Sequence, residues 1–88
     1  MDVLIKKATD FKFKHPGFII LMKVGENGNK FQSYNNDART MANILELPLL
    51  NYNGNDYCEF DYNNLDKFLP RLVRAGEKVA ICEQTQDP

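Results

Sequence analysis

The 88-residue sequence has no tryptophan, one histidine and two cysteines, and each scarcity excludes a class of protein. Cys58 and Cys82 are too few for a disulfide framework. Together with His15 they cannot complete a four-ligand structural zinc site. Nucleophilic catalysis needs a nucleophile, a base and an orienting group, and one histidine gives little from which to build them. We therefore expect no catalytic residues, no metal and no cofactor.

The sequence also lacks a charge excess and a long hydrophobic run. Eleven basic and twelve acidic residues leave a net charge of -1, which argues mildly against a dedicated nucleic-acid binder. Residues 1–30 hold six lysines against three acids, whereas residues 31–88 hold five basic and nine acidic groups. Such asymmetry marks either a nucleic-acid-facing end or two differently solvated faces. No apolar run approaches a membrane helix, and no signal peptide is evident, so we expect a cytoplasmic protein.

The length fits one small domain over residues 1–88 with a single modest core. Apolar spacing predicts a helix that starts near Leu4 and ends at His15-Pro16-Gly17. Further helices are predicted over 36–46 and 63–75, and strands over 17–24, 30–34, 49–52, 57–60 and 78–83. Pro70 should kink the last helix or delay its regular start. This order predicts an α+β fold, a small mixed β-sheet with about three helices packed against it.

The C-terminal stretch carries the most specific motif. It reads Val-Ala-Ile-Cys-Glu-Gln at positions 79–84 and, two residues later, Asp-Pro at 87–88. Two upstream segments agree in order and spacing: 14–25, which begins Lys-His-Pro-Gly, and 36–47, which begins Asn-Asp-Ala. Over nearly all 88 residues, this pattern resembles the N-terminal, mismatch-recognition domain of the MutS family of DNA mismatch-repair proteins.

The resemblance implies a function in reading mispaired DNA. In that family a Phe-x-Glu motif on the first hairpin inserts an aromatic ring beside the mispair, and the glutamate hydrogen-bonds the displaced base. Insertion costs a few kcal/mol of stacking, least where pairing is already faulty, so the defect itself supplies selectivity. The family's ATPase, clamp and dimer-forming parts lie outside these residues. Because the family continues into a next domain, a fragment of a longer protein is also an expectation.

The reading motif departs from the family pattern. Family members have Gly-Asp-Phe-Tyr-Glu-Leu-Phe before the acidic helix start. Counting back from Ala38, Lys30 stands at the phenylalanine position and Gln32 at the glutamate position, after a three-residue insertion at 27–29. Phe31 is aromatic but one position away, so on a strand it should point to the opposite face. The Phe-x-Glu motif is therefore predicted to be lost, as in paralogous subunits that support a partner carrying it.

Three interpretations of positions 30–32 remain open. The first is a hairpin arm with Phe31 in the core and the two polar side chains outside. The second is sequence-independent DNA binding, with Lys23 and Lys30 on phosphates and Gln32 on a groove edge. The third is a mismatch reader in a shifted register, with Phe31 as the wedge.

The sequence thus predicts a non-catalytic, DNA-contacting module of a mismatch-repair protein. Its candidate DNA-binding residues are Lys23, Lys30, Phe31 and Gln32. The expected partners are duplex or mismatched DNA, and either the remaining MutS-like domains or a partner subunit, with no membrane. The alternative is a protein-interaction or structural module that keeps the fold without reading DNA. Lysines gathered on one face would favour DNA, whereas a contiguous exposed apolar patch would favour the alternative.

Overall fold

The computed structural model describes residues 2–83, and it confirms the predicted order of elements. The helices are α1 (Asp2–Lys14), α2 (Asn36–Leu45) and α3 (Leu65–Arg74). The strands are β1 (Phe18–Val24), β2 (Lys30–Tyr34), β3 (Leu50–Tyr52), β4 (Asn55–Asp61) and β5 (Lys78–Glu83). Two 3-10 turns, η1 (Glu26–Gly28) and η2 (Tyr62–Asn64), follow β1 and β4.

The last third of the chain contains α3 and the start of the C-terminal motif. The helix α3 continues through Pro70 and begins after the η2 turn. Positions 84–88, which hold the end of the C-terminal motif, lie outside the described residues. Within residues 2–83, no helix combines the length and the apolar character that crossing a membrane requires.

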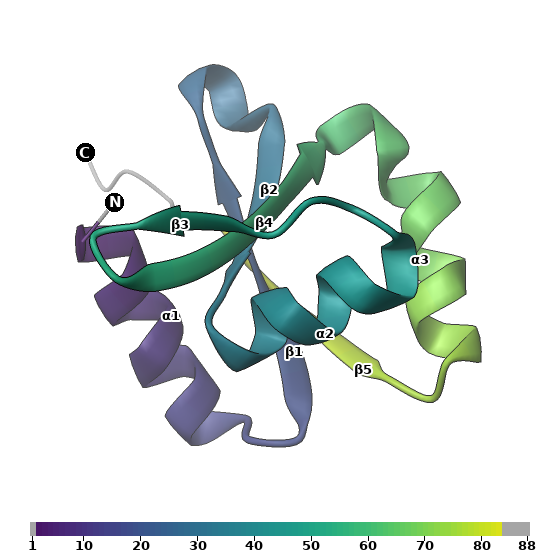
Figure 1. Cartoon of the computed structure of the whole chain (residues 1–88), viewed down its shortest axis with the longest axis horizontal. Coiled ribbons are helices and arrows are strands. Elements are labelled where there is room, and N and C mark those ends of the chain that lie inside the picture. The colour runs from purple at the N-terminus through teal and green to yellow at the C-terminus, as the bar shows by residue number, and fades with distance from the viewer. Residues whose placement is uncertain (1, 84–88) are drawn as a thin grey trace.

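The five strands form one mixed sheet in the order β3-β4-β2-β1-β5 (Figure 1). The strand β1 is antiparallel to β2 and parallel to β5, whereas β4 is antiparallel to both β2 and β3. Parallel neighbours need a long crossover connection, and the chain from β2 to α3 supplies it. The helix α1 packs on one face of the sheet, and α2 and α3 pack on the other. This arrangement confirms the predicted α+β class.

The strand β1 lies at the centre of two cores, because successive side chains point to opposite faces of a strand. Ile19 and Leu21 belong to the cluster beneath α2 and α3. Ile20 and Met22 belong to the cluster beneath α1. All four side chains are buried. The apolar run was predicted to form a strand covered on both faces, and it does.

The second hairpin has the two-residue turn that its Asn-Gly pair favours. Tyr52 pairs with Asn55, which leaves Asn53 and Gly54 as the turn, with φ of 49° and 84°. Two positive φ angles are the signature of a type I′ turn, whose twist matches that of the flanking strands. The strand β4 therefore starts two residues earlier than the sequence predicted.

The helix α2 ends on a left-handed residue. Glu46 has φ 59° and ψ 43°, and its N–H donates to the carbonyl of Ala42. Glycine is the usual residue at this position because any other side chain costs about 1–2 kcal/mol in the left-handed region. Glu46 is exposed, so its side chain does not compensate through packing.

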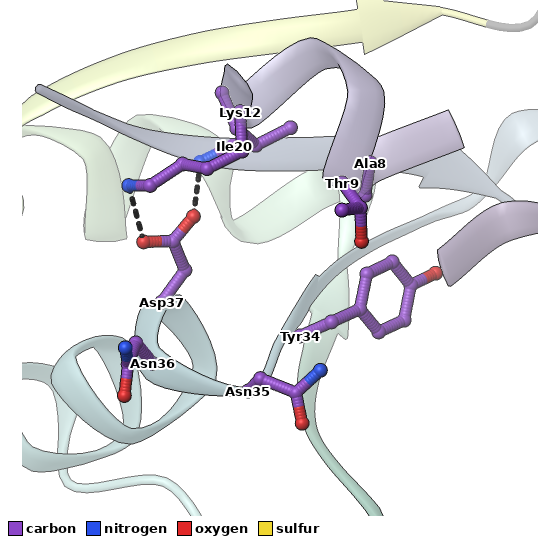
Figure 2. A pocket seen from close by; sticks show the side chains of 8 residues that line it. All are labelled: Ala8, Thr9, Lys12, Ile20, Tyr34, Asn35, Asn36 and Asp37. Atoms are coloured by element: carbon purple, nitrogen blue, oxygen red, sulfur yellow. Dashed lines mark hydrogen bonds and ion pairs between the residues drawn. The ribbon is translucent and has the colours of Figure 1, made fainter. Parts of the chain in front are cut away.

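One carboxylate, that of Asp37, joins three elements. Pairing between β1 and β2 stops at Met22 and Gln32. Beyond that point the Oδ2 of Asp37 accepts a hydrogen bond from the Ile20 N–H at 3.0 Å (Figure 2). The Oδ1 of Asp37 accepts a hydrogen bond from the Lys12 Nζ at 2.8 Å. The carboxylate thus continues the ladder where the strand has turned away. It also places negative charge in the first turn of α2, where the helix dipole favours it.

The Glu46→Gly variant should be more stable than the wild type by up to about 1 kcal/mol, because glycine adopts the left-handed conformation without strain. The free energy of unfolding would be measured by urea titration followed by far-UV circular dichroism, since the chain has no tryptophan. The control is Lys7→Gly in the exposed interior of α1, which should lose about 1 kcal/mol. A loss of stability in Glu46→Gly would contradict the assigned cap.

The Asp37→Ala variant should lose about 1–3 kcal/mol of unfolding free energy, because the part-buried N–H of Ile20 and the Lys12 ammonium both lose their acceptor. Asp37→Asn keeps one amide oxygen for the Ile20 N–H, so it should lose less. The same urea titration measures both variants. Equal losses in the two variants would mean that the Ile20 hydrogen bond contributes nothing.

Candidate functional site

The four candidate DNA-binding residues lie at one end of the sheet but not on one face. Lys23 is the cross-strand partner of Phe31, so both side chains point to the α2/α3 face. Lys30 and Gln32 flank Phe31 and therefore point to the α1 face. The structure does not place the two lysines together on one side of the sheet. Lys23 and Lys30 therefore do not form the single basic face that would have favoured DNA binding.

Phe31 belongs to the core. Its side chain is 1% exposed, as the first interpretation predicted. It lies within a row of four aromatic rings, with Tyr62 at 5.7 Å and Phe60 at 5.6 Å between ring centroids, and Phe68 follows 5.1 Å from Phe60. The Tyr62 end of this row is exposed, whereas Phe60 and Phe68 are buried. In this conformation Phe31 is not available as a wedge.

Gln32 is also buried, at 7% exposure, which corrects the expectation that it lies outside. The reason is a polar network on the α1 face. The Gln32 Nε2 donates to Glu59 Oε1 at 2.8 Å, and the Tyr34 hydroxyl donates to Gln32 Oε1 at 2.7 Å. Lys30 Nζ donates to Glu59 Oε2 at 3.2 Å. Both ends of the Gln32 amide are therefore engaged, so burial of this polar group is compensated.

This network changes two pKa values. The hydrogen bond from Gln32 is the main cause that lowers the pKa of the Glu59 carboxyl, and Lys30 adds to it. Burial raises the pKa of the Tyr34 hydroxyl, and the charge of Glu59 raises it further. Glu59 is thus a carboxylate and Tyr34 a neutral donor at neutral pH. The network is electrically balanced by Lys30.

Lys23 lies between an aromatic ring and a carboxylate. Its Nζ is 4.9 Å from the centroid of the Tyr62 ring and 3.2 Å from Glu83 Oε1. Its stem runs against the loop at 27–29, where a Cβ on Gly28 would come within 3.0 Å of the Lys23 Cε. The Tyr62 N–H donates to the carbonyl of Asn29 at 2.9 Å. The loop at 27–29 is therefore attached to the η2 turn that follows β4.

These contacts border a surface pocket of about 480 Å³. Its walls include Lys23, Asn27, Asn29, Asp61, Tyr62 and Asn63. Tyr62 is not among the residues that the sequence analysis predicted to bind DNA. The sequence signal available was an aromatic residue directly after a strand, and its partner loop is more than thirty positions away.

The other candidate sites in residues 2–83 have fewer groups that are free to bind a ligand or react. The pocket in Figure 2 has a volume of about 170 Å³, and its charged groups, Lys12 and Asp37, are bonded to each other. Cys58 lies in the core, where burial raises the pKa of its thiol to about 11, so it is protonated at neutral pH. Across residues 2–83, no three His, Cys, Asp or Glu side chains are grouped so as to hold a metal ion.

Comparison with known proteins gives one family. Residues 3–88 match the family model described as MutS domain I. Relatives called "DNA mismatch repair protein MutS" include those of Bacteroides fragilis, 37% identical over 90 residues, Parabacteroides distasonis, 40% over 90, and Petrotoga mobilis, 35% over 85. Each comparison covers 97% of this chain and 10% of the relative. The chain therefore spans about a tenth of the length of the curated relatives it matches.

The Gln32→Glu variant should be less stable than the wild type by about 1–3 kcal/mol at neutral pH, because it places a second carboxylate against Glu59. Lowering the pH should narrow the difference, since protonation of one carboxyl removes the repulsion. The wild type itself should lose stability as the pH falls. The pKa of Glu59 is lowered in the folded state, so the stabilisation that is present above the unfolded pKa of Glu59 is lost on acidification. Urea titrations across this range would show both trends. A pH-independent difference would contradict the network.

Proposed function

This chain belongs to the MutS domain I family, and from that membership we propose that it is a DNA-contacting module of a mismatch-repair protein. The observation that carries the proposal is the match over residues 3–88 to relatives named for DNA mismatch repair. The match covers domain I and about a tenth of each relative. ATP hydrolysis is therefore not part of the function proposed, and the module acts without catalysis of its own.

We assign phosphate contact to Lys23 and Lys30. Each is paired with a carboxylate, Glu83 for Lys23 and Glu59 for Lys30. Both ion pairs are partly exposed to solvent, where an ion pair contributes little, so we propose that a phosphate replaces the carboxylate. Because two lysines contact few phosphates, binding should be weak. Its logarithm should fall with the logarithm of salt concentration with a slope of only about −2.

Mismatch reading by the Phe-x-Glu motif is not part of the proposal. Lys30 stands at the wedge position and has no ring to stack. Phe31 would have to leave the core, and deleting a buried phenylalanine side chain costs about 3–5 kcal/mol in comparable cores. Gln32 would have to give up its bonds to Glu59 and Tyr34 to reach a groove edge. Direct DNA contacts of Phe31 and Gln32 therefore stay predictions from the sequence.

A second function, a protein-interaction or structural module, has one observation in its favour. Phe13 near the end of α1 is 88% exposed, and Val3 at its start is also exposed. A partner that docks on α1 would cover Phe13, although apolar surface marks an interface by itself only where it forms a contiguous patch. The partners of this type would be the remaining domains of a MutS-like protein or a partner subunit.

Fluorescence anisotropy at low salt would decide between the two. The chain would be titrated with a labelled matched duplex, a duplex with one unpaired base, and single strands. We expect salt-sensitive binding to the duplexes, and a weaker, less salt-dependent interaction for the double variant Lys23→Gln/Lys30→Gln. The matched control is Lys67→Gln/Lys78→Gln, which removes the same charge from α3 and from the start of β5 and should bind as the wild type does.

Equal losses in both double variants would mean that the hairpin end is not the contact surface. No binding of the wild type to any DNA would overturn the proposed function in favour of the interaction module. Phe31→Ala tests the shifted register. A loss of preference for the unpaired base in Phe31→Ala, with folding retained and with the preference kept in Tyr62→Ala, would restore Phe31 as a wedge.

A further inference from the structure

The most exposed ring of the aromatic row lies beside a polar pocket. Tyr62 is 48% exposed, although its ring stacks on Phe31 with an interplanar angle of 22°. We propose that Tyr62 is a stacking platform for a nucleobase taken out of a DNA strand, and that the pocket of about 480 Å³ beside it receives the edge of that base. This inference rests on the proposed DNA-contacting function and names a site for it outside the Phe-x-Glu positions.

Tyr62 is fixed in a way that suits a platform. Its backbone N–H is bonded to the Asn29 carbonyl, and its ring lies against the buried Phe31. A ring held in place before binding loses little side-chain entropy when a base stacks on it. Stacking is tolerant of sequence because every base has an aromatic face. The platform therefore does not depend on the identity of the base.

The walls of the pocket can bond the edge of a base. Asn27, Asn29 and Asn63 line it, and an asparagine side chain carries a carbonyl acceptor and an NH₂ donor. Asp61 also lines it, and a carboxylate is an acceptor for an exocyclic amino group, as on cytosine or adenine. The donors and acceptors on a base edge thus have counterparts in the wall.

The charge of the pocket favours a base over a free phosphate. Lys23 and Asp61 both line the pocket, and the Nζ of Lys23 is bonded to Glu83. A phosphate in the pocket would meet the Asp61 carboxylate as well as the Lys23 ammonium. Glu83 is 60% exposed, so its bond to Lys23 is weak and Lys23 can turn outward to the backbone beside the base. The base then occupies the pocket and the phosphate stays outside it.

A duplex carrying one unpaired 2-aminopurine tests the platform, because stacking on a tyrosine quenches the fluorescence of this base analogue. We expect quenching with the wild type and with Tyr62→Phe, which keeps the ring. Tyr62→Ala should abolish the quenching and weaken binding to this duplex by about 5- to 140-fold, the range measured for removing one stacked aromatic. Its binding to matched duplex should change little. The matched control is Tyr52→Ala, which removes a tyrosine of 41% exposure on β3.

A second variant tests the site without removing the Tyr62 ring, so that a loss of binding caused by misfolding can be recognised. Asn63→Ala removes one amide from the wall and leaves the Tyr62–Phe31 stack in place, so it should reduce the preference for the unpaired base while the circular dichroism spectrum stays unchanged. Wild-type quenching retained in Tyr62→Ala would overturn the platform. If the wild type binds matched duplex but does not quench the unpaired 2-aminopurine, the platform fails and the DNA-contacting function stands. If the wild type binds no DNA, both fail.

Discussion

The Asp37 carboxylate is the contact on which the arrangement of the sheet and helices depends. The strands β1 and β2 pair over three residues and then separate, because the chain must leave the sheet to form α2. An unpaired strand amide in a part-buried position is costly, and Asp37 accepts the one on Ile20. The same group binds Lys12 of α1. One side chain therefore relates α1, β1 and α2 to one another.

The hairpin end is governed by the alternation of side chains along a strand. Because β1 is buried on both faces, each residue of β2 beside it is assigned to one core or the other. Phe31 faces α2 and α3, and its neighbours Lys30 and Gln32 face α1. A one-residue shift of an aromatic side chain thus converts a surface position into a core position. The glutamine is buried in turn because Glu59 stands opposite it and Tyr34 lies two residues further along the same face.

The aromatic row connects this core to the surface. Phe68, Phe60 and Phe31 are buried, and Tyr62 continues the row to solvent. The loop at 27–29 is bonded to Tyr62 and packs on Lys23. This loop therefore lies against an exposed ring.

The sequence by itself determined the order of the elements, the fold class and the family. Three local patterns were sufficient for this: the amphipathic spacing of α2, the Asn-Gly turn at 53–54 and the apolar run of β1. Each extends over only a few residues, so it can be recognised in the sequence. The sequence also indicated that Phe31 points away from the face of Lys30 and Gln32. Only the tertiary structure decided that Lys23 and Lys30 lie on opposite faces, that Gln32 is buried by Glu59, and that Tyr62 meets the loop at 27–29. These outcomes depend on the register across β1, β2 and β4, and the paired residues of β2 and β4 are about thirty positions apart in the chain.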